Sequence, residues 1–144
     1  MLKKVLLVLT IFLLVGCSSK KFYLEDKYYQ DGTYIEITAS DYEKIKDGSY
    51  VLFTYNSYCQ FSEPCQDVFK SIMEKYNISF ISMPYAEFKS TKLHDKVKYA
   101  PSVIIVKNGQ IKAYLDSEKD SDIDLYQDSA KFEEWLSKYI YLEK

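Results

Sequence analysis

Residues 99–109, YAPSVIIVKNG, place a proline directly before a short apolar run that ends at an Asn-Gly pair. The run is rich in β-branched residues and is bounded by turn-forming residues, so it predicts a strand over 102–106. Asn108 and Gly109 form the dipeptide most typical of a two-residue hairpin turn. We therefore expect an antiparallel strand to follow over 110–115.

Three further strands are predicted before this hairpin. Residues 50–55 are almost all apolar or aromatic, which is typical of a central strand that is covered on both faces. Residues 34–38 alternate in character after Gly32, and residues 78–83 form another short apolar segment. These segments are enough to build one sheet around a central strand.

Two amphipathic helices are predicted beside these strands. After Cys65 an apolar residue recurs at every third or fourth position up to Tyr76, so one face of a helix there should pack on the sheet. The same pattern returns over 130–139, at the end of the chain. Both helices therefore have an apolar face that a sheet can cover.

Weaker signals complete the plan. Ser40 and Glu43 fit a capping box, in which two side chains satisfy exposed backbone N–H groups, so a short helix is expected there. Another helix is expected over 88–97, whereas the acidic segment 116–128 is expected to be a loop. Strands that alternate with helices and end in a hairpin predict one mixed α/β domain.

Together these features resemble the thioredoxin superfamily. The resemblance rests on the strand 50–55, on Tyr58-Cys59 just beyond it, on the amphipathic helix and on Ala100-Pro101 before the hairpin. It covers residues 34–139 and implies a thioredoxin-like α/β fold with a central mixed β-sheet flanked by helices. It also implies a cis Pro101 beside Cys59, because only X-Pro bonds adopt the cis form at little cost.

Cys59 is the expected nucleophile. It lies between a strand and a helix, where the N–H groups at the helix N-terminus stabilise a thiolate. The resemblance implies that this sulfur attacks disulfides, while Pro101 and Ala100 contact the substrate backbone. The family usually has Cys-x-x-Cys at this point, whereas residues 59–65 of this chain are CQFSEPC.

Two registers fit this wider spacing. In the first, Ser62 takes the position of the second cysteine, and one continuous helix separates Cys59 from Cys65 by about 9 Å, which is too far for a disulfide. In the second, the loop is longer, Pro64 enters the first helical turn and Cys65 is the resolving thiol. We favour the second register, with Cys59 and Cys65 as the catalytic pair and Ser62 as the alternative to Cys65.

Thioredoxin places a buried carboxylate under its redox pair, and the matching position here is near Phe53, on a strand without an acidic residue. Proton transfer to the resolving thiol is therefore expected to be slower. His94 is the only histidine and is expected to be a solvent-exposed helix residue. One histidine and two cysteines make a poor ligand set for zinc, so neither a metal nor an organic cofactor is expected.

The first residues predict export with a lipid anchor. Lys3 and Lys4 precede the apolar run 5–15, which is shorter than the about 20 residues that span a membrane. The run ends in Leu14-Val15-Gly16-Cys17, which resembles the lipobox of bacterial lipoproteins, so cleavage would leave a lipidated Cys17. We expect a signal peptide over 1–16, the lipidated cysteine and a tether over 17–31, and the domain over 32–144.

These patterns predict a thiol–disulfide oxidoreductase, anchored on the outer face of the cell membrane and acting on exported proteins. Its expected partners are an exported protein substrate or a membrane redox partner, and we expect a monomer. The formal net charge of −2 gives no electrostatic basis for binding nucleic acid. The alternative is a non-catalytic thioredoxin-fold binding or accessory module, for example in bacteriocin export, because a fold does not fix a function.

Overall fold

The computed structural model describes residues 20–56 and 64–144. The predictions for the signal peptide over 1–16, and for Cys17, Cys59 and Ser62, therefore lie outside the described residues. Within the described residues, none of the helices has the length and apolar character needed to cross a bilayer.

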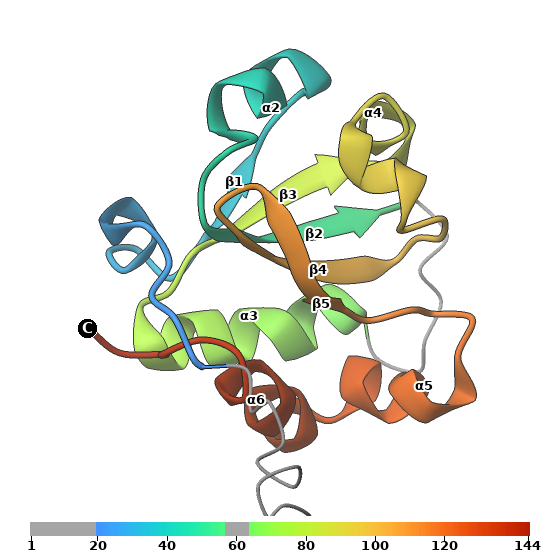
Figure 1. The fold of residues 1–144 in the computed structure, drawn as a ribbon. Coiled ribbons are helices and arrows are strands. Elements are labelled where there is room, and N and C mark those ends of the chain that lie inside the picture. The colour runs from blue at the N-terminus through green and yellow to red at the C-terminus, as the bar shows by residue number, and fades with distance from the viewer. Residues whose placement is uncertain (1–19, 57–63) are drawn as a thin grey trace, which may run out of the picture.

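Five strands form one mixed sheet (Figure 1). They are β1 (Tyr34–Glu36), β2 (Tyr50–Tyr55), β3 (Phe80–Pro84), β4 (Ser102–Lys107) and β5 (Gln110–Tyr114). Their order across the sheet is β1-β3-β2-β4-β5, so β2 lies at the centre. β1, β3 and β2 run parallel, whereas β4 is antiparallel to both β2 and β5. The central mixed sheet that the sequence predicted is thus confirmed.

Helices cover both faces of the sheet (Figure 1). One face carries α3 (Cys65–Tyr76), α5 (Asp120–Gln127) and α6 (Ser129–Ser137), which also contact one another. The other face carries α2 (Ala39–Ile45) and α4 (Tyr85–Phe88). Short 3-10 helices occupy Asp26–Tyr28 and Lys92–Asp95.

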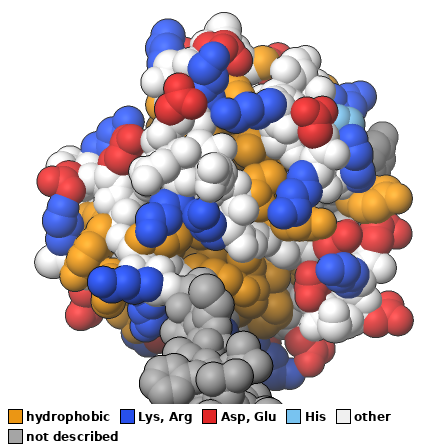
Figure 2. Space-filling model, in the orientation of Figure 1, with side chains coloured by type: hydrophobic (Ala, Val, Ile, Leu, Met, Phe, Trp, Pro, Cys, Tyr) orange, Lys and Arg blue, Asp and Glu red, His pale blue; other side chains and the backbone are white. Residues whose placement is uncertain are grey.

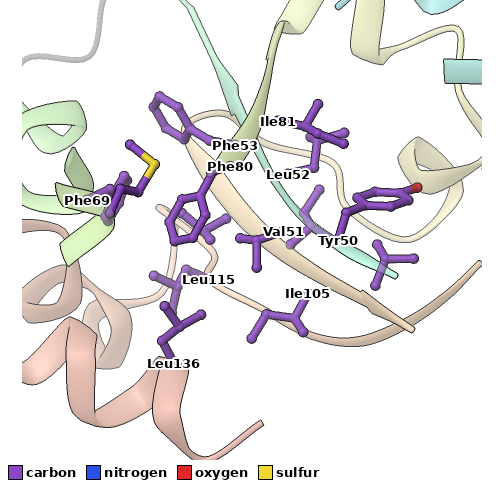
Figure 3. Close-up of a cluster of buried hydrophobic side chains, with 14 of the residues drawn as sticks. Tyr50, Val51, Leu52, Phe53, Phe69, Phe80, Ile81, Ile105, Leu115 and Leu136 are labelled. Carbon is purple, nitrogen blue, oxygen red and sulfur yellow. The ribbon is translucent and has the colours of Figure 1, made fainter. Parts of the chain in front are cut away.

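The core lies on both faces of β2, as its continuous apolar sequence predicted. Val51 and Phe53 point toward α3, whereas Tyr50 and Leu52 point to the opposite face (Figure 3). On the α3 side the centre is Phe69, whose ring lies 4.5 Å from that of Phe132 and 5.3 Å from that of Phe53, measured between ring centroids. This aromatic cluster fixes α3, and hence its first residue, relative to the central strand.

The hairpin between β4 and β5 forms at the predicted dipeptide. Asn108 and Gly109 have φ angles of 48° and 73°, which a two-residue hairpin turn requires. A Cβ on Gly109 would lie 2.8 Å from the carbonyl oxygen of Lys46. The turn therefore needs glycine for its backbone conformation and for the close approach of the neighbouring chain.

The first turn of α2 is capped differently from the prediction. Thr38, and not Ser40, is the N-cap: its hydroxyl accepts from the N–H of Asp41, while the Asp41 carboxylate accepts from the N–H of Thr38, both at 3.3 Å. The capping box predicted at Ser40 and Glu43 is therefore two residues too late. Both pairs have suitable side chains, and the sequence alone does not distinguish them.

The secondary structure predicted for two segments, 88–97 and 116–128, is wrong. The helix expected over 88–97 is replaced by α4, which ends at Phe88, and by the separate 3-10 helix Lys92–Asp95. The Thr91 hydroxyl donates to the Phe88 carbonyl at 2.9 Å, in the turn between them. The acidic segment 116–128, expected to be a loop, contains α5, which is fixed on the core by the fully buried Tyr126.

Part of the segment expected to be a tether belongs to the packed domain. Phe22, Leu24 and Tyr28 are all buried. The Phe22 N–H donates to the Tyr139 carbonyl, and the Phe22 carbonyl accepts from the Tyr141 N–H, both at 3.1 Å. The expected tether over 17–31 is thus too long, and the domain begins before residue 32.

Candidate functional site

Three elements meet at one end of the sheet (Figure 1). The carboxyl end of β2 lies beside the start of β4, because Thr54 pairs with Ser102. α3 begins at Cys65 on the same end of the sheet. The sequence-predicted residues Cys65, Ala100 and Pro101 therefore lie around the end of the central strand, while Cys59 and Ser62 lie outside the described residues.

Cys65 is the first residue of α3, and its side chain is fully buried. The preceding Pro64 is the N-cap, with φ −57° and ψ 118°, so the helix does not continue backward through it. The two registers differ in residues 59–63, which lie outside the described residues, so both remain predictions. At the N-terminus of α3 the helix dipole favours negative charge on a nearby sulfur.

The peptide bond between Ala100 and Pro101 is cis, as the resemblance implied. Pro101 is buried, and Ala100 is half-buried beside it. The Ser102 hydroxyl donates to the Tyr99 carbonyl at 2.6 Å, and the Tyr85 hydroxyl donates to the Lys98 carbonyl. Hydrogen bonds on both sides of Ala100 and Pro101 therefore fix the shape of this segment.

Tyr126 is a residue of this site that the sequence did not indicate. It comes from α5, is fully buried, and donates its hydroxyl proton to the Pro101 carbonyl at 2.7 Å. Its ring lies 5.8 Å from that of Phe69, one helical turn after Cys65. Burial raises the pKa of the Tyr126 phenol, and negative charge on Cys65 raises this pKa further. The phenol therefore stays protonated and keeps donating to the Pro101 carbonyl, while its ring contacts Phe69 of α3.

Replacing Tyr126 with phenylalanine should lower the free energy of unfolding by about 1–3 kcal/mol, because the change removes the donor to a buried carbonyl. Urea denaturation of the two proteins measures this difference. The control is Tyr114→Phe, since the half-buried Tyr114 has no hydrogen bond to its hydroxyl among the described residues. That change should alter the free energy of unfolding by less than about 0.5 kcal/mol. Equal effects of the two changes would contradict the role of Tyr126.

Two open cavities flank this end of the sheet. One has a volume of about 250 Å³ and is lined by Tyr34, Glu36, Phe53, Tyr55, Gln66 and Ser82. The other, of about 340 Å³, is lined by Tyr55, Asn56, Pro84, Tyr85, Ala86 and Lys89. Tyr55 borders both, and its hydroxyl donates to the Glu36 carboxylate at 2.9 Å. Both cavities are rich in tyrosine, which offers an apolar ring together with a polar group.

His94 is half-buried rather than exposed, so that prediction is wrong. Its Nε2 lies 3.3 Å from the Tyr85 hydroxyl, and its ring contacts the ring of Phe88 with the centroids 6.0 Å apart. Within residues 20–56 and 64–144, no three His, Cys, Asp or Glu side chains lie close enough together to hold a metal ion.

Solved structures of thioredoxins are similar to this chain. A thioredoxin from Schistosoma mansoni is similar at 22% identity over 77% of this chain and 99% of its own, with a TM-score of 0.51. This chain has a thioredoxin-like fold. Spinach chloroplast thioredoxin f is similar at 15% identity over 69% of this chain and 88% of its own, with a TM-score of 0.47. No model of a known protein family and no characterised protein sequence matches this chain.

The buried polar groups of the described residues carry no charge. The buried polar side chains of the described residues are all hydroxyls, on Ser49, Thr54, Ser79, Ser82, Thr91 and Ser102. Phe53, near the position of the carboxylate that the resemblance implied, is buried against Phe69. The described part of the chain therefore buries no carboxylate that is able to exchange protons with Cys65.

Proposed function

We propose that this chain is a thiol–disulfide oxidoreductase, anchored to the outer face of the cell membrane by lipid on Cys17 and acting on exported proteins. The observation that carries the proposal is the placement of Cys65, buried as the first residue of α3 at the end of the sheet where the cis Pro101 directly precedes β4. Cys59 precedes this helix in the sequence, on the segment that joins it to the central strand.

In the proposed reaction the Cys59 thiolate attacks one sulfur of a substrate disulfide. A mixed disulfide forms, and the other substrate sulfur leaves as a thiolate. The Cys65 thiolate then attacks the Cys59 sulfur, which releases the second substrate thiol and leaves a Cys59–Cys65 disulfide. In the opposite direction the same steps transfer that disulfide to a substrate dithiol, and a membrane redox partner restores the starting state in either case.

Ala100 and Pro101 are proposed to bind the substrate backbone as an added strand beside the cysteines. Their segment is suited to this role because Tyr126 and Tyr85 hold it from two sides. The two tyrosine-lined cavities next to Tyr55 would receive substrate side chains, since aromatic rings accept apolar groups and their hydroxyls accept or donate hydrogen bonds.

A redox titration of the full chain in detergent tests this proposal. Equilibration with glutathione mixtures, followed by alkylation and mass measurement, should show Cys59 and Cys65 changing together in one two-electron transition. The midpoint should lie within roughly −120 to −270 mV, the range of thioredoxin-like redox proteins. If Cys59 and Cys65 are alkylated independently of one another at every glutathione redox potential, they do not form a catalytic pair.

A non-catalytic binding module is the second candidate, and the lack of a buried carboxylate in the described residues favours it. In that case the disulfide would be structural or the thiols inert. Structural disulfides are typically more reducing than about −300 mV, so glutathione would not open them. The same titration therefore separates the two functions, and the rate of Cys59 alkylation against pH gives a second readout.

A further inference from the structure

The described chain begins near the end of β4 that lies opposite Pro101. β4 starts beside Pro101 and ends at Lys107, which places these two residues about 20 Å apart. Lys20, the first described residue, lines a cavity together with Lys107, so it lies at the far end of that strand. It follows Cys17 by three residues, at most about 11 Å of extended chain.

This cavity is basic. It has a volume of about 250 Å³ and is lined by Lys20, Phe22, Lys107, Lys112 and Tyr139. The Lys107 ammonium lies 5.2 Å from the centre of the Phe22 ring. None of its three lysines forms an ion pair with a carboxylate of the described residues. In a chain of net negative charge, three such lysines around one hollow form a local site for an anion.

Aromatic side chains are exposed at the same end of the domain. Tyr23 and Tyr141 are 48% and 38% exposed, and their rings stack with centroids 4.4 Å apart. The Lys21 ammonium lies 5.8 Å from the centre of the Tyr141 ring. Tyrosine and lysine together suit the polar boundary of a bilayer, where a ring meets acyl chains and an ammonium meets phosphates. In Figure 2, lysine and hydrophobic side chains lie side by side over β5.

We propose that the lysine cavity, defined by Lys20, Lys107 and Lys112, binds the phosphate headgroups of anionic lipids in the membrane that holds the chain. The proposal rests on the lipid anchor proposed above, which brings this end of the domain to the bilayer surface. The negative charge of lipid phosphates complements the three ammonium groups. Each lysine that lies near an anionic membrane surface is attracted to it and strengthens binding. The domain then stands with the Cys65 end pointing away from the membrane, toward exported proteins.

Amine labelling of the full lipidated chain in vesicles tests this orientation. The chain is reconstituted in phosphatidylcholine, or in phosphatidylcholine mixed with phosphatidylglycerol, and the acetylation of each lysine is followed by mass spectrometry. Labelling of Lys107 and Lys112 should fall about fivefold in the anionic vesicles and recover at about 1 M salt, where charges are screened within about 3 Å. Lys98 and Lys119, toward the Cys65 end, should be labelled equally in both vesicles.

A pair of matched variants identifies the lysines responsible. Lys20→Gln combined with Lys107→Gln should abolish the protection of Lys112, whereas Lys98→Gln combined with Lys119→Gln should leave it unchanged. If the chain floats with the vesicles but Lys112 is labelled equally in both kinds, the headgroup site is refuted while the proposed anchor stands. A chain that does not float would refute the anchor and this proposal with it. Protection of Lys112 by inorganic phosphate in neutral vesicles would also overturn lipid as the ligand.

Discussion

Replacing Phe69 with alanine should lower the free energy of unfolding by about 3–5 kcal/mol. The side chain is fully buried, and its ring contacts those of Phe53, Tyr126 and Phe132. Alanine would leave a cavity between α3, α5, α6 and the central strand, because the three surrounding rings come from different elements and cannot all move in to fill it. Urea unfolding followed by circular dichroism measures the loss.

Lys70→Ala, the neighbouring exposed position in the same helix, is the control. It keeps the helical backbone and changes no buried contact, so its effect should stay within about 0.5 kcal/mol. A loss below about 1 kcal/mol for Phe69→Ala would mean that the aromatic cluster does not hold α3 on the sheet. The placement of Cys65, which depends on this helix, would then need another explanation.

Replacing Cys59 with serine should reduce disulfide exchange to the uncatalysed rate, because a hydroxyl does not replace the attacking thiolate. Cys65→Ser should instead retain the first step and accumulate a mixed disulfide between Cys59 and the substrate, since the resolving thiol is missing. Reduction of a disulfide-bonded model protein measures the rate, and non-reducing electrophoresis detects the trapped complex.

Ser62→Ala distinguishes the two registers. If Cys65 resolves the mixed disulfide, this variant should exchange disulfides at the rate of the unchanged protein. If the site is a monothiol Cys-x-x-Ser arrangement, Ser62→Ala should slow the reaction, while Cys65→Ser should exchange disulfides normally and trap nothing. The opposite behaviour of the same two variants thus assigns the role of Cys65.

The strands were the most predictable part of this fold. β2 and β4 were correctly located because their apolar, β-branched runs are short and bounded by turn residues, and the Asn108-Gly109 turn fixed the hairpin between β4 and β5. The helix α3 was predicted because its apolar residues recur at every third or fourth position and form one face. In each case the signal is local, so a short window of sequence contains all of it.

α5 could not be predicted in this way. Among its eight residues Tyr126 alone is fully buried, three others are aspartates, and Ile123 and Leu125 are only half-buried. Its position depends on contacts with residues distant in sequence, such as the hydrogen bond from Tyr126 to Pro101 and the ring contact with Phe69. Tertiary contacts of this kind override a weak local preference.

The residues of the candidate site also differ in whether the sequence could predict them. Cys65 and Pro101 were predicted as site residues from the resemblance to the thioredoxin superfamily, which rests on the order of strand, cysteine, helix and proline along the chain. Tyr126 was missed because one tyrosine among the 15 in the chain has nothing in its own surroundings to mark it. Its proximity to both residues exists only in the folded protein.

The pairing of Phe22 with the C-terminal segment has a consequence for the order in which the protein assembles. The backbone partners of Phe22 belong to Tyr139 and Tyr141, which are synthesised long after it. The N-terminal segment therefore cannot take its native place until α6 and the residues directly after it have been made. A chain truncated before Tyr139 would leave Phe22 without these backbone partners.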